Sequence, residues 1–199
     1  LNDITMISNI LSDFSKDIWI YIMLDYIKQK NIKSEVGSST MPHKVNPINF
    51  ENAEGNLEIT TALSQSISKR LMSSRLQRDL TDSTVLRNLG VIYSHFYISI
   101  TSLIKGMKKI DVNIKKIDED LNKSWEILAE PIQTIMRYHN VENSYDLIKD
   151  ATRGKDITKE TIKEIIDKCD LSDSIKNKLL KLKPRDYIGL AKKLTLKKN

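Results

Sequence analysis

The chain has 199 residues, of which 40% are hydrophobic and 29% charged, a composition typical of globular proteins. Its net charge is +6, and the basic surplus is divided equally between residues 1–110 and 111–199. A nucleic-acid-binding protein usually concentrates its basic residues on one face, so we expect no nucleic-acid partner. No apolar run is long enough for a membrane span, so we expect no membrane partner either. The single cysteine, Cys169, excludes an internal disulfide and predicts a cytoplasmic location.

The first segment of the chain has the pattern of a long helix. Its apolar residues recur in steps of three and four, which predicts lengthwise packing against another helix along a seam of Ile4, Ile7, Leu11, Phe14, Ile18 and Tyr21. Other apolar residues lie off this seam, which favours a helix covered on several sides. Because Leu1 opens into the pattern without a capping residue, we expect the chain to be a piece of a longer protein.

Two further long helices are predicted, one from after Pro47 to about Leu71 and one from about Thr81 to Ile110. Ordinary globular helices are shorter. Long helices with several apolar faces are typical of a bundle that continues into neighbouring subunits. No strand-like alternation of useful length is present.

After Ile110 the predicted helices become shorter and are separated by clear start and stop signals. The signals are a first-turn proline, a glycine that follows a helix end, two N-caps and a proline that opens the last helix: Pro131, Gly154, Thr158, Ser172 and Pro184. The sequence therefore predicts an all-α protein. Residues 1–110 form part of a long-helix bundle, and residues 111–199 form a smaller helical C-terminal domain.

The stretch VGSSTMPHKVNP, residues 36–47, interrupts the helical pattern with polar side chains. Gly37 permits backbone angles that other residues avoid, and Pro42 and Pro47 exclude a continuous helix. Lys44 is the only charged residue of the stretch, and backbone N–H groups add positive potential. A simple connection between helices is less favoured, because connectors seldom carry so many functional side chains. The stretch is predicted to be a loop that closes over an anion.

The residues from Gly37 to Pro47 resemble GSSxMPxKxNP, the signature loop of the fumarase/aspartase superfamily, at every constant position. Members of this superfamily eliminate fumarate, or a close relative, from a succinyl-bearing substrate. Within the superfamily, four segments resemble the adenylosuccinate lyase family: Phe50–Asn56, Ser74–Asn88, Trp125–Thr134 and Thr152–Lys155. The resemblance covers nearly the whole chain. It implies part of the central helical domain of these enzymes, the long-helix bundle of the fumarase/aspartase type, and all of their C-terminal domain.

The resemblance implies a β-elimination in purine biosynthesis. Adenylosuccinate would give AMP and fumarate, and the succinyl-aminoimidazole-carboxamide ribotide would be cleaved in the same way. It also implies a homotetramer with active sites shared between subunits. This elimination needs no metal or organic cofactor, and no Cys/His cluster in the sequence offers a metal site.

The resemblance assigns the base to Ser38, which needs nearby positive charge to hold an alkoxide. Lys44 and Asn46 would stabilise the charge that develops on the substrate carboxylate. The remaining substrate contacts in and after the loop are Ser39, Val45 and Asn52.

The family's general acid is a histidine from upstream sequence, which this chain lacks. Glu51 is a candidate to orient that histidine. The chain's own histidines are expected to be structural or solvent-exposed: His43, His95 and His139.

A second group of residues suits a phosphate. Arg78 and Arg87 flank Ser83 and Thr84, and guanidinium groups bind phosphate through two parallel hydrogen bonds. From the residues alone, a helix N-cap with a surface ion pair to Asp79 or Asp82 is an equal alternative. The resemblance favours phosphate binding, through Arg78 and the segment Ser83, Thr84, Val85, Leu86 and Arg87.

Two alternatives remain. Another lyase of the superfamily, such as argininosuccinate lyase or fumarase, would act on a substrate without phosphate, so the predicted phosphate group argues against it. A non-catalytic helical scaffold or nucleic-acid binder would not depend on Ser38.

Overall fold

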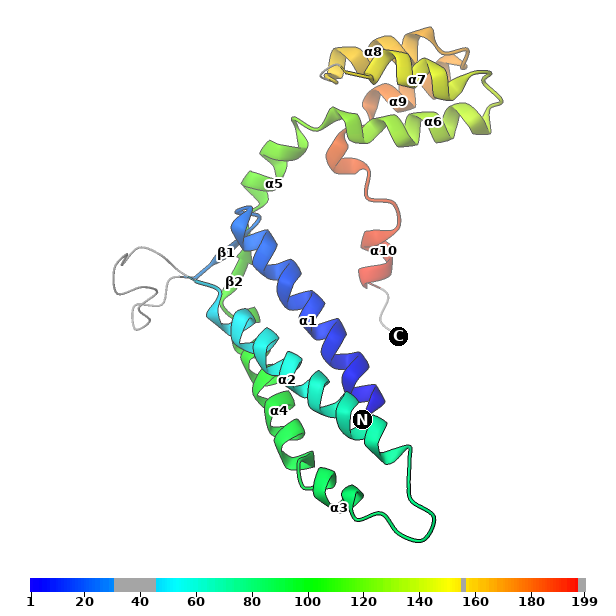
Figure 1. The fold of residues 1–199 in the computed structure, drawn as a ribbon. Coiled ribbons are helices and arrows are strands. Elements are labelled where there is room, and N and C mark those ends of the chain that lie inside the picture. Colours follow the sequence, from blue (N-terminus) through cyan, green and yellow to red (C-terminus); the bar gives the residue numbers. More distant parts are fainter. Residues whose placement is uncertain (31–45, 155–156, 197–199) are drawn as a thin grey trace. The chain divides into compact units, whose positions relative to one another are not determined.

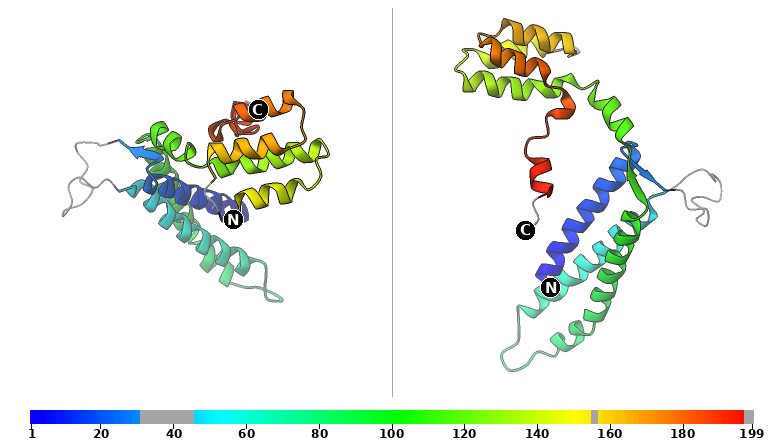
Figure 2. Two further views of the ribbon diagram at one scale, coloured as in Figure 1. Left: turned by 90° about the horizontal axis from the view of Figure 1, so that it is seen from above. Right: turned by 180° about the vertical axis from the view of Figure 1, so that it is seen from behind.

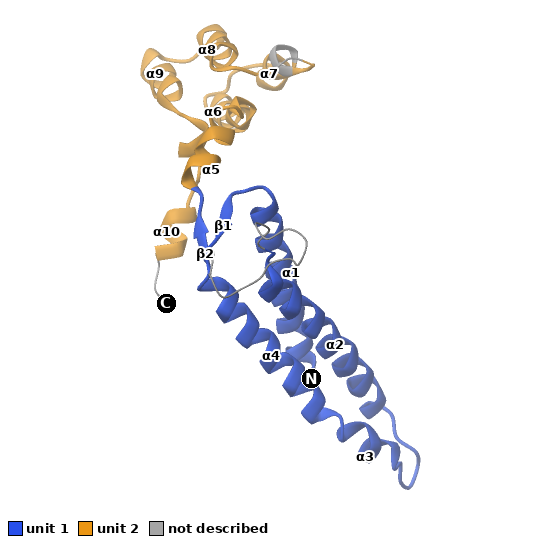
Figure 3. Ribbon diagram, turned by 90° about the vertical axis from the view of Figure 1, so that its left-hand side faces the viewer, with its two compact units in different colours: residues 1–113 blue, residues 114–199 orange. Residues whose placement is uncertain are grey.

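The structure is a computed structural model that describes residues 1–30, 46–154 and 157–196. The chain divides into two compact units, Leu1–Asn113 and Ile114–Asn199, called unit 1 and unit 2 below (Figure 3). Helices make up most of both units, which confirms the predicted all-α class. The assignment of residues 1–110 and 111–199 to two enzyme domains stays a prediction.

Unit 1 is built from three long helices that run side by side (Figures 1 and 2). They are α1, Asn2–Met23; α2, Ile48–Leu71; and α4, Leu89–Met107. Helix α2 packs against both α1 and α4. The short helix α3, Thr81–Leu86, lies at one end of this bundle, and a small β-ribbon lies at the other.

The bounds of α2 confirm the prediction made from Pro47 and the apolar stripe. Pro47 is the N-cap residue, and its carbonyl accepts hydrogen bonds from the N–H groups of Phe50 (2.9 Å) and Glu51 (3.2 Å). Phe50 is 1% exposed and packs with Ile18 of α1 and Leu103 of α4. The start of α2 is therefore held in the core of unit 1.

The face of α1 that packs in the core of unit 1 agrees only in part with the predicted seam, of which Leu11, Phe14 and Ile18 lie in or against that core. Ile7 and Tyr21 are exposed, whereas Ser8 and Ser15 are almost fully buried. Serine side chains are small, so they let the two helices approach closely, and the Ser15 hydroxyl donates to the Leu11 carbonyl at 2.8 Å. Other large apolar residues, such as Ile7 and Tyr21, are left on faces of α1 that this unit does not cover.

The predicted third helix, from Thr81 to Ile110, is divided into α3 and α4. The break lies at Arg87 and Asn88. The Asn88 side-chain amide donates to the carbonyl of Val85 at 3.3 Å, and its backbone N–H donates to the same carbonyl at 3.0 Å. A side chain that competes for backbone carbonyls in this way interrupts a helix.

A two-stranded antiparallel ribbon was not predicted. It pairs β1, Ile27–Gln29, with β2, Ile110–Val112, so that Ile27 faces Val112. Three-residue strands are too short to show an alternating pattern. Next to the ribbon, the Asn113 side chain donates to the Asp25 carbonyl at 2.8 Å. The contact ties the end of unit 1 to the turn after α1.

Unit 2 contains shorter elements. They are α5, Ile114–Leu121; the 3-10 turn η1, Trp125–Leu128; α6, Ala129–Tyr138; α7, Ser144–Thr152; α8, Lys159–Lys168; α9, Asp173–Lys181; the 3-10 turn η2, Pro184–Asp186; and α10, Ala191–Leu196. Helices α6 to α9 share one core, in which Leu128, Ile132, Met136 and Ile166 are at most 1% exposed. Within the described ranges, no helix has the length and hydropathy of a membrane span.

The predicted helix signals of unit 2 are largely confirmed. Thr158 caps α8 in a reciprocal capping box with Thr161, and Gly154 has a φ of +72° after the end of α7. Ser172 is the N-cap residue of α9, although its side chain makes no capping hydrogen bond. Pro184 opens only the turn η2, and α10 begins later, at Ala191.

We predict that Gly106→Ala destabilises unit 1. A Cβ atom at Gly106 would lie 2.9 Å from two ring atoms of the buried Phe50, so the ring would have to shift. Overpacking of this kind costs about 1–3 kcal/mol of unfolding free energy, measurable by urea denaturation. The matched control is Gly55→Ala in α2, where nothing lies within 4 Å of the added Cβ. That variant should gain about 1 kcal/mol from helix propensity. Equal effects of both substitutions would contradict the packing argument.

Candidate active site

Most of the predicted signature loop lies outside the described residues. The predicted site residues outside the described ranges are Ser38, Ser39, Lys44 and Val45, and His43 is also outside them. The described chain resumes at Asn46, which is half-buried, and Pro47, which is buried. These two residues lead directly into α2, which begins at Ile48.

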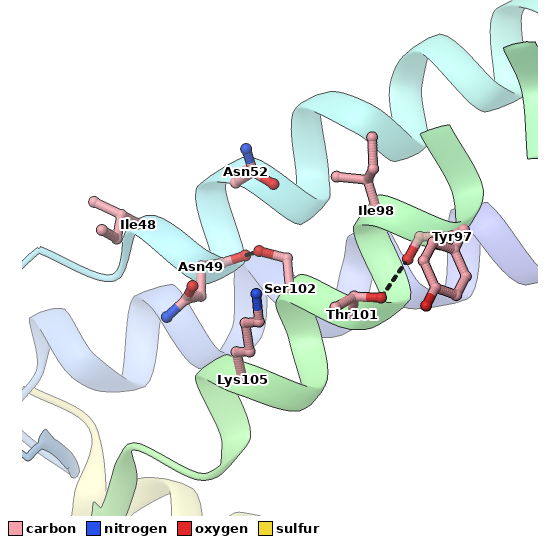
Figure 4. A pocket seen from close by; sticks show the side chains of 8 residues that line it. All are labelled: Ile48, Asn49, Asn52, Tyr97, Ile98, Thr101, Ser102 and Lys105. Atoms are coloured by element: carbon pink, nitrogen blue, oxygen red, sulfur yellow. Dashed lines mark hydrogen bonds between the residues drawn. The ribbon is translucent and has the colours of Figure 1, made fainter. Parts of the chain in front are cut away.

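A pocket of about 410 Å³ opens beside the start of α2 (Figure 4). Asn49 and Asn52 line it from α2, and Ser102 and Lys105 line it from α4. The Ser102 hydroxyl donates to the Asn49 carbonyl at 2.9 Å, which joins the two walls. The structure thus places Asn52, a predicted substrate contact, in a pocket that the cationic side chain of Lys105 also lines.

Lys105 is a candidate that the sequence analysis missed. It is exposed and is the only Asp, Glu, Lys or Arg among the 19 residues of α4. A lone cation in an otherwise uncharged helix was a signal that could have identified it. Together with the Asn52 amide, its ammonium group suits the carboxylate of a ligand.

The carboxylate of Glu51 is held from the neighbouring helix. The Trp19 indole Nε1 donates a hydrogen bond to Glu51 Oε1 at 3.0 Å. One turn further along, Lys16 and Glu54 form an ion pair of 3.4 Å between the same two helices. These contacts fix the orientation of Glu51 at the loop end of α2, while its proposed role toward a histidine stays a prediction.

Two of the chain's histidines lie among the described residues. His95 Nδ1 is 2.7 Å from the Asn56 side-chain oxygen, so this ring joins α4 to α2. His139 is exposed at the end of α6. Across residues 1–30, 46–154 and 157–196, no three His, Cys, Asp or Glu side chains lie close enough to hold a metal ion.

The segment that joins α2 to α3 is organised around Asp79, which is 8% exposed. The Asp79 carboxylate accepts hydrogen bonds from the Thr81 hydroxyl (2.6 Å) and the Thr81 N–H (3.0 Å). It also pairs with Arg70 and, at 3.4 Å, with Arg75. The Thr81 hydrogen bonds, with help from the two guanidinium groups, lower the pKa of Asp79. Asp79 therefore anchors the start of α3.

The predicted phosphate-binding arginines are exposed on either side of this anchor. Arg78 immediately precedes Asp79, and Arg87 is the C-cap residue of α3. Neither forms an ion pair with another described residue. The alternative predicted for this segment required an ion pair with Asp79 or Asp82, but Asp79 pairs with Arg70 and Arg75.

Between the two arginines, α3 carries the other predicted phosphate contacts. Ser83 and Thr84 are exposed, Val85 is half-buried, and Leu86 is 40% exposed. The Ser83 hydroxyl donates to the Leu80 carbonyl at 3.1 Å. The segment thus presents both guanidinium groups and two hydroxyls near one another in the sequence.

The two predicted parts of the site lie at opposite ends of α2 (Figure 1). Asn46, Pro47 and Asn52 lie toward its start, and the segment from Arg78 to Arg87 follows its end. Helix α2 has 24 residues, so it is about 36 Å long at 1.5 Å per residue. Asn52 and the segment from Arg78 to Arg87 are therefore not brought together at one end of α2 within one copy of unit 1.

Comparison with known proteins identifies the family. The family described as adenylosuccinate lyase C-terminal matches residues 74–188, and the family described as lyase matches residues 2–59. The chain belongs to the adenylosuccinate lyase family. The first match extends over both structural units.

Individual members of the family resemble the chain closely. It is 52% identical to adenylosuccinate lyase of Legionella pneumophila strain Corby over 188 residues, covering 94% of this chain and 41% of the relative. It is 50% identical to the Escherichia coli K12 enzyme over 184 residues, covering 92% and 40%. The chain thus spans about two fifths of the length of these adenylosuccinate lyases.

Solved structures support the fold. Class II fumarase from Schistosoma mansoni has a TM-score of 0.67 and 19% identity, covering 92% of this chain and 37% of that one. The 3-carboxy-cis,cis-muconate lactonizing enzyme from Pseudomonas putida has the same TM-score and 17% identity, covering 94% and 44%. At these identities the similarity concerns the fold alone.

We predict that Asp79→Asn destabilises this adenylosuccinate lyase family member at neutral pH but not in acid. The pKa of Asp79 in the folded state lies below its ordinary value of 3.8. The charged carboxylate therefore stabilises the fold above that value, and the contribution is lost as the pH falls through the folded-state pKa. Thermal melting of both proteins from pH 7 to pH 2.5 should show a difference that shrinks below about pH 4. A difference that is constant over this range would contradict the assignment.

Proposed function

We propose that this chain forms part of an adenylosuccinate lyase that eliminates fumarate from adenylosuccinate to give AMP. The same site would cleave the succinyl-aminoimidazole-carboxamide ribotide in purine biosynthesis, in the cytoplasm. The observation that carries the proposal is the pair of exposed arginines, Arg78 and Arg87, that Asp79 leaves unpaired among the described residues. A phosphate-bearing substrate explains them, and fumarase or argininosuccinate lyase substrates do not.

In the proposed mechanism, Ser38 removes the proton beside the substrate carboxylate, and the C–N bond then breaks. Lys44 and Asn46 stabilise the charge that builds up on that carboxylate, which Ser39 also binds. Asn52 adds a donor from the first turns of α2, in the pocket that also contains Lys105. Arg78 and Arg87 hold the phosphate through charge-assisted hydrogen bonds. The general acid is a histidine that this chain does not supply.

The separation of the two parts along α2 supports an active site composed from several copies. Because Asn52 and the segment from Arg78 to Arg87 lie toward opposite ends of α2, the loop of one copy would meet the phosphate-binding segment of another. We propose a homotetramer with shared sites. Apolar side chains on the outside of unit 1 suit such an assembly, and they include Ile10, Met23, Tyr93, Tyr97 and Ile104, each more than half exposed.

A chimera tests the activity. The part of E. coli adenylosuccinate lyase that precedes the matched region is joined to residues 1–199, and fumarate release is measured with adenylosuccinate and with argininosuccinate. We expect turnover of adenylosuccinate alone. Ser38→Ala should lower kcat by about 100- to 10,000-fold, because it removes the base. Arg87→Ala should mainly raise KM, by about 10-fold or more, whereas the exposed Arg137→Ala on α6 should change neither constant.

Several outcomes would contradict the proposal. Turnover of argininosuccinate alone would assign the chain to a different lyase. Full activity of the Ser38→Ala chimera would show that Ser38 is not the base. Residues 1–199 without the E. coli part should be inactive, because they lack the general acid, so turnover by this chain alone would also count against the proposal. Size-exclusion chromatography of each variant shows whether assembly is intact.

Mixing two impaired chimeras tests whether the site is shared. Ser38→Ala removes the proposed base and Arg87→Ala weakens the proposed phosphate site, so a mixed assembly can contain sites in which both residues are intact. At a substrate concentration below KM, we expect the two variants unfolded and refolded together to be more active than the sum of the two refolded separately. Absence of recovery in a mixture proven to contain both chains would contradict a shared site.

A further inference from the structure

Unit 2 contains a pocket that is larger than the one beside the start of α2, and the proposed elimination does not use it. It has a volume of about 820 Å³, within the range of small-molecule sites. Its polar lining consists of Glu126, Glu130, Gln133, Tyr145, Lys149 and Arg153. These residues belong to segments that resemble the family, Trp125–Thr134 and Thr152–Lys155, or lie in α7 between them.

Two rows of side chains form the walls. Glu126, Glu130 and Gln133 follow one another along η1 and α6, whereas Tyr145 and Lys149 are four residues apart on α7. Ile148, which is 8% exposed and part of the core, lines the base of the pocket. The walls are therefore carried by helices that the core of unit 2 holds in place.

The charges of the two walls are opposite but do not pair. Among the described residues, neither Glu126 nor Glu130 forms an ion pair with Lys149 or Arg153. The Lys149 ammonium group lies instead 5.8 Å from the centre of the Tyr145 ring, in a cation–π contact. Two carboxylates and two cations thus face a space in which a ligand can contact both.

We propose that this pocket binds a nucleoside monophosphate. Tyr145, which is 57% exposed, offers a ring on which a base can stack. Lys149 and Arg153 suit the phosphate, and carboxylates such as Glu130 accept hydrogen bonds from ribose hydroxyls. A zwitterionic amino acid would use the charges but would leave the Tyr145 ring and the Gln133 amide without a partner. A nucleotide uses both the ring and the charges of the lining.

This proposal is independent of the proposed lyase activity. All of its residues lie in unit 2, whereas Arg78 and Arg87 lie in unit 1. Tyr145 lies in the first turn of α7 and Arg153 is its C-cap residue, so the two lie toward opposite ends of the helix, which suits a ligand with a base at one end and a phosphate at the other.

Calorimetric titration of residues 1–199 with AMP and with adenosine tests the site. The wild-type chain should bind AMP about 10-fold more tightly than adenosine, because only AMP carries the phosphate. Lys149→Met should remove this preference by weakening AMP binding alone. Tyr145→Leu should weaken both ligands, because both carry the base. Lys163→Met, at an exposed lysine of α8 outside the pocket, is the matched control and should change neither affinity.

Three results would overturn the proposal. The first is the absence of saturable AMP binding to the wild-type chain. The second is an AMP preference that persists in Lys149→Met, or that Lys163→Met reduces equally. The third is loss of AMP binding in Arg87→Ala with no effect of Lys149→Met, which would place the nucleotide on unit 1. Circular dichroism of each variant confirms that the helices are intact.

Discussion

The length and rigidity of α2 are the constraint on which the rest of this structure depends. The helix leaves the signature loop at Pro47 and ends where the segment toward Arg78 begins. Its 24 residues extend over about 36 Å and cannot be shortened without breaking backbone hydrogen bonds. Asn52 near its start and the segment that follows its end are therefore held apart in each copy of the chain.

The packing of α2 explains why unit 1 has apolar surfaces through which copies of the chain could associate. Buried serines such as Ser8 and Ser64 let α1 and α2 approach closely, and Phe50 fills the space beside Gly106 of α4. These contacts use one side of each helix. The apolar residues on the other sides stay in water in an isolated unit, which is unfavourable in proportion to their area. The contacts that hold α2 in place therefore leave apolar surfaces exposed, and neighbouring copies would cover these surfaces.

Local sequence signals allowed much of the fold to be predicted. Features that depend on packing between distant residues could not be predicted from them. Pro47, Thr158 and Gly154 mark helix ends through their own backbone chemistry, so their positions were confirmed. The break at Asn88 depends on a side chain that competes for the Val85 carbonyl, which an apolar pattern does not reveal. The seam of α1 was partly wrong because apolar residues lie on several faces, and the buried serines decide which face meets α2.

The same distinction applies to the candidate site. Motif resemblance named residues such as Asn52 and Arg78, whereas Lys105 lines the pocket from a helix with no recognised motif. Asp79 is an instructive case, because its sequence neighbour Arg78 is the obvious partner, yet Arg70 and Arg75 take that place. Because those pairs occupy Asp79, Arg78 has no ion pair with another described residue. Under the proposed function, elimination chemistry and phosphate recognition would lie toward separate ends of one helix, so a substitution near Arg87 would alter substrate choice without disturbing the start of α2.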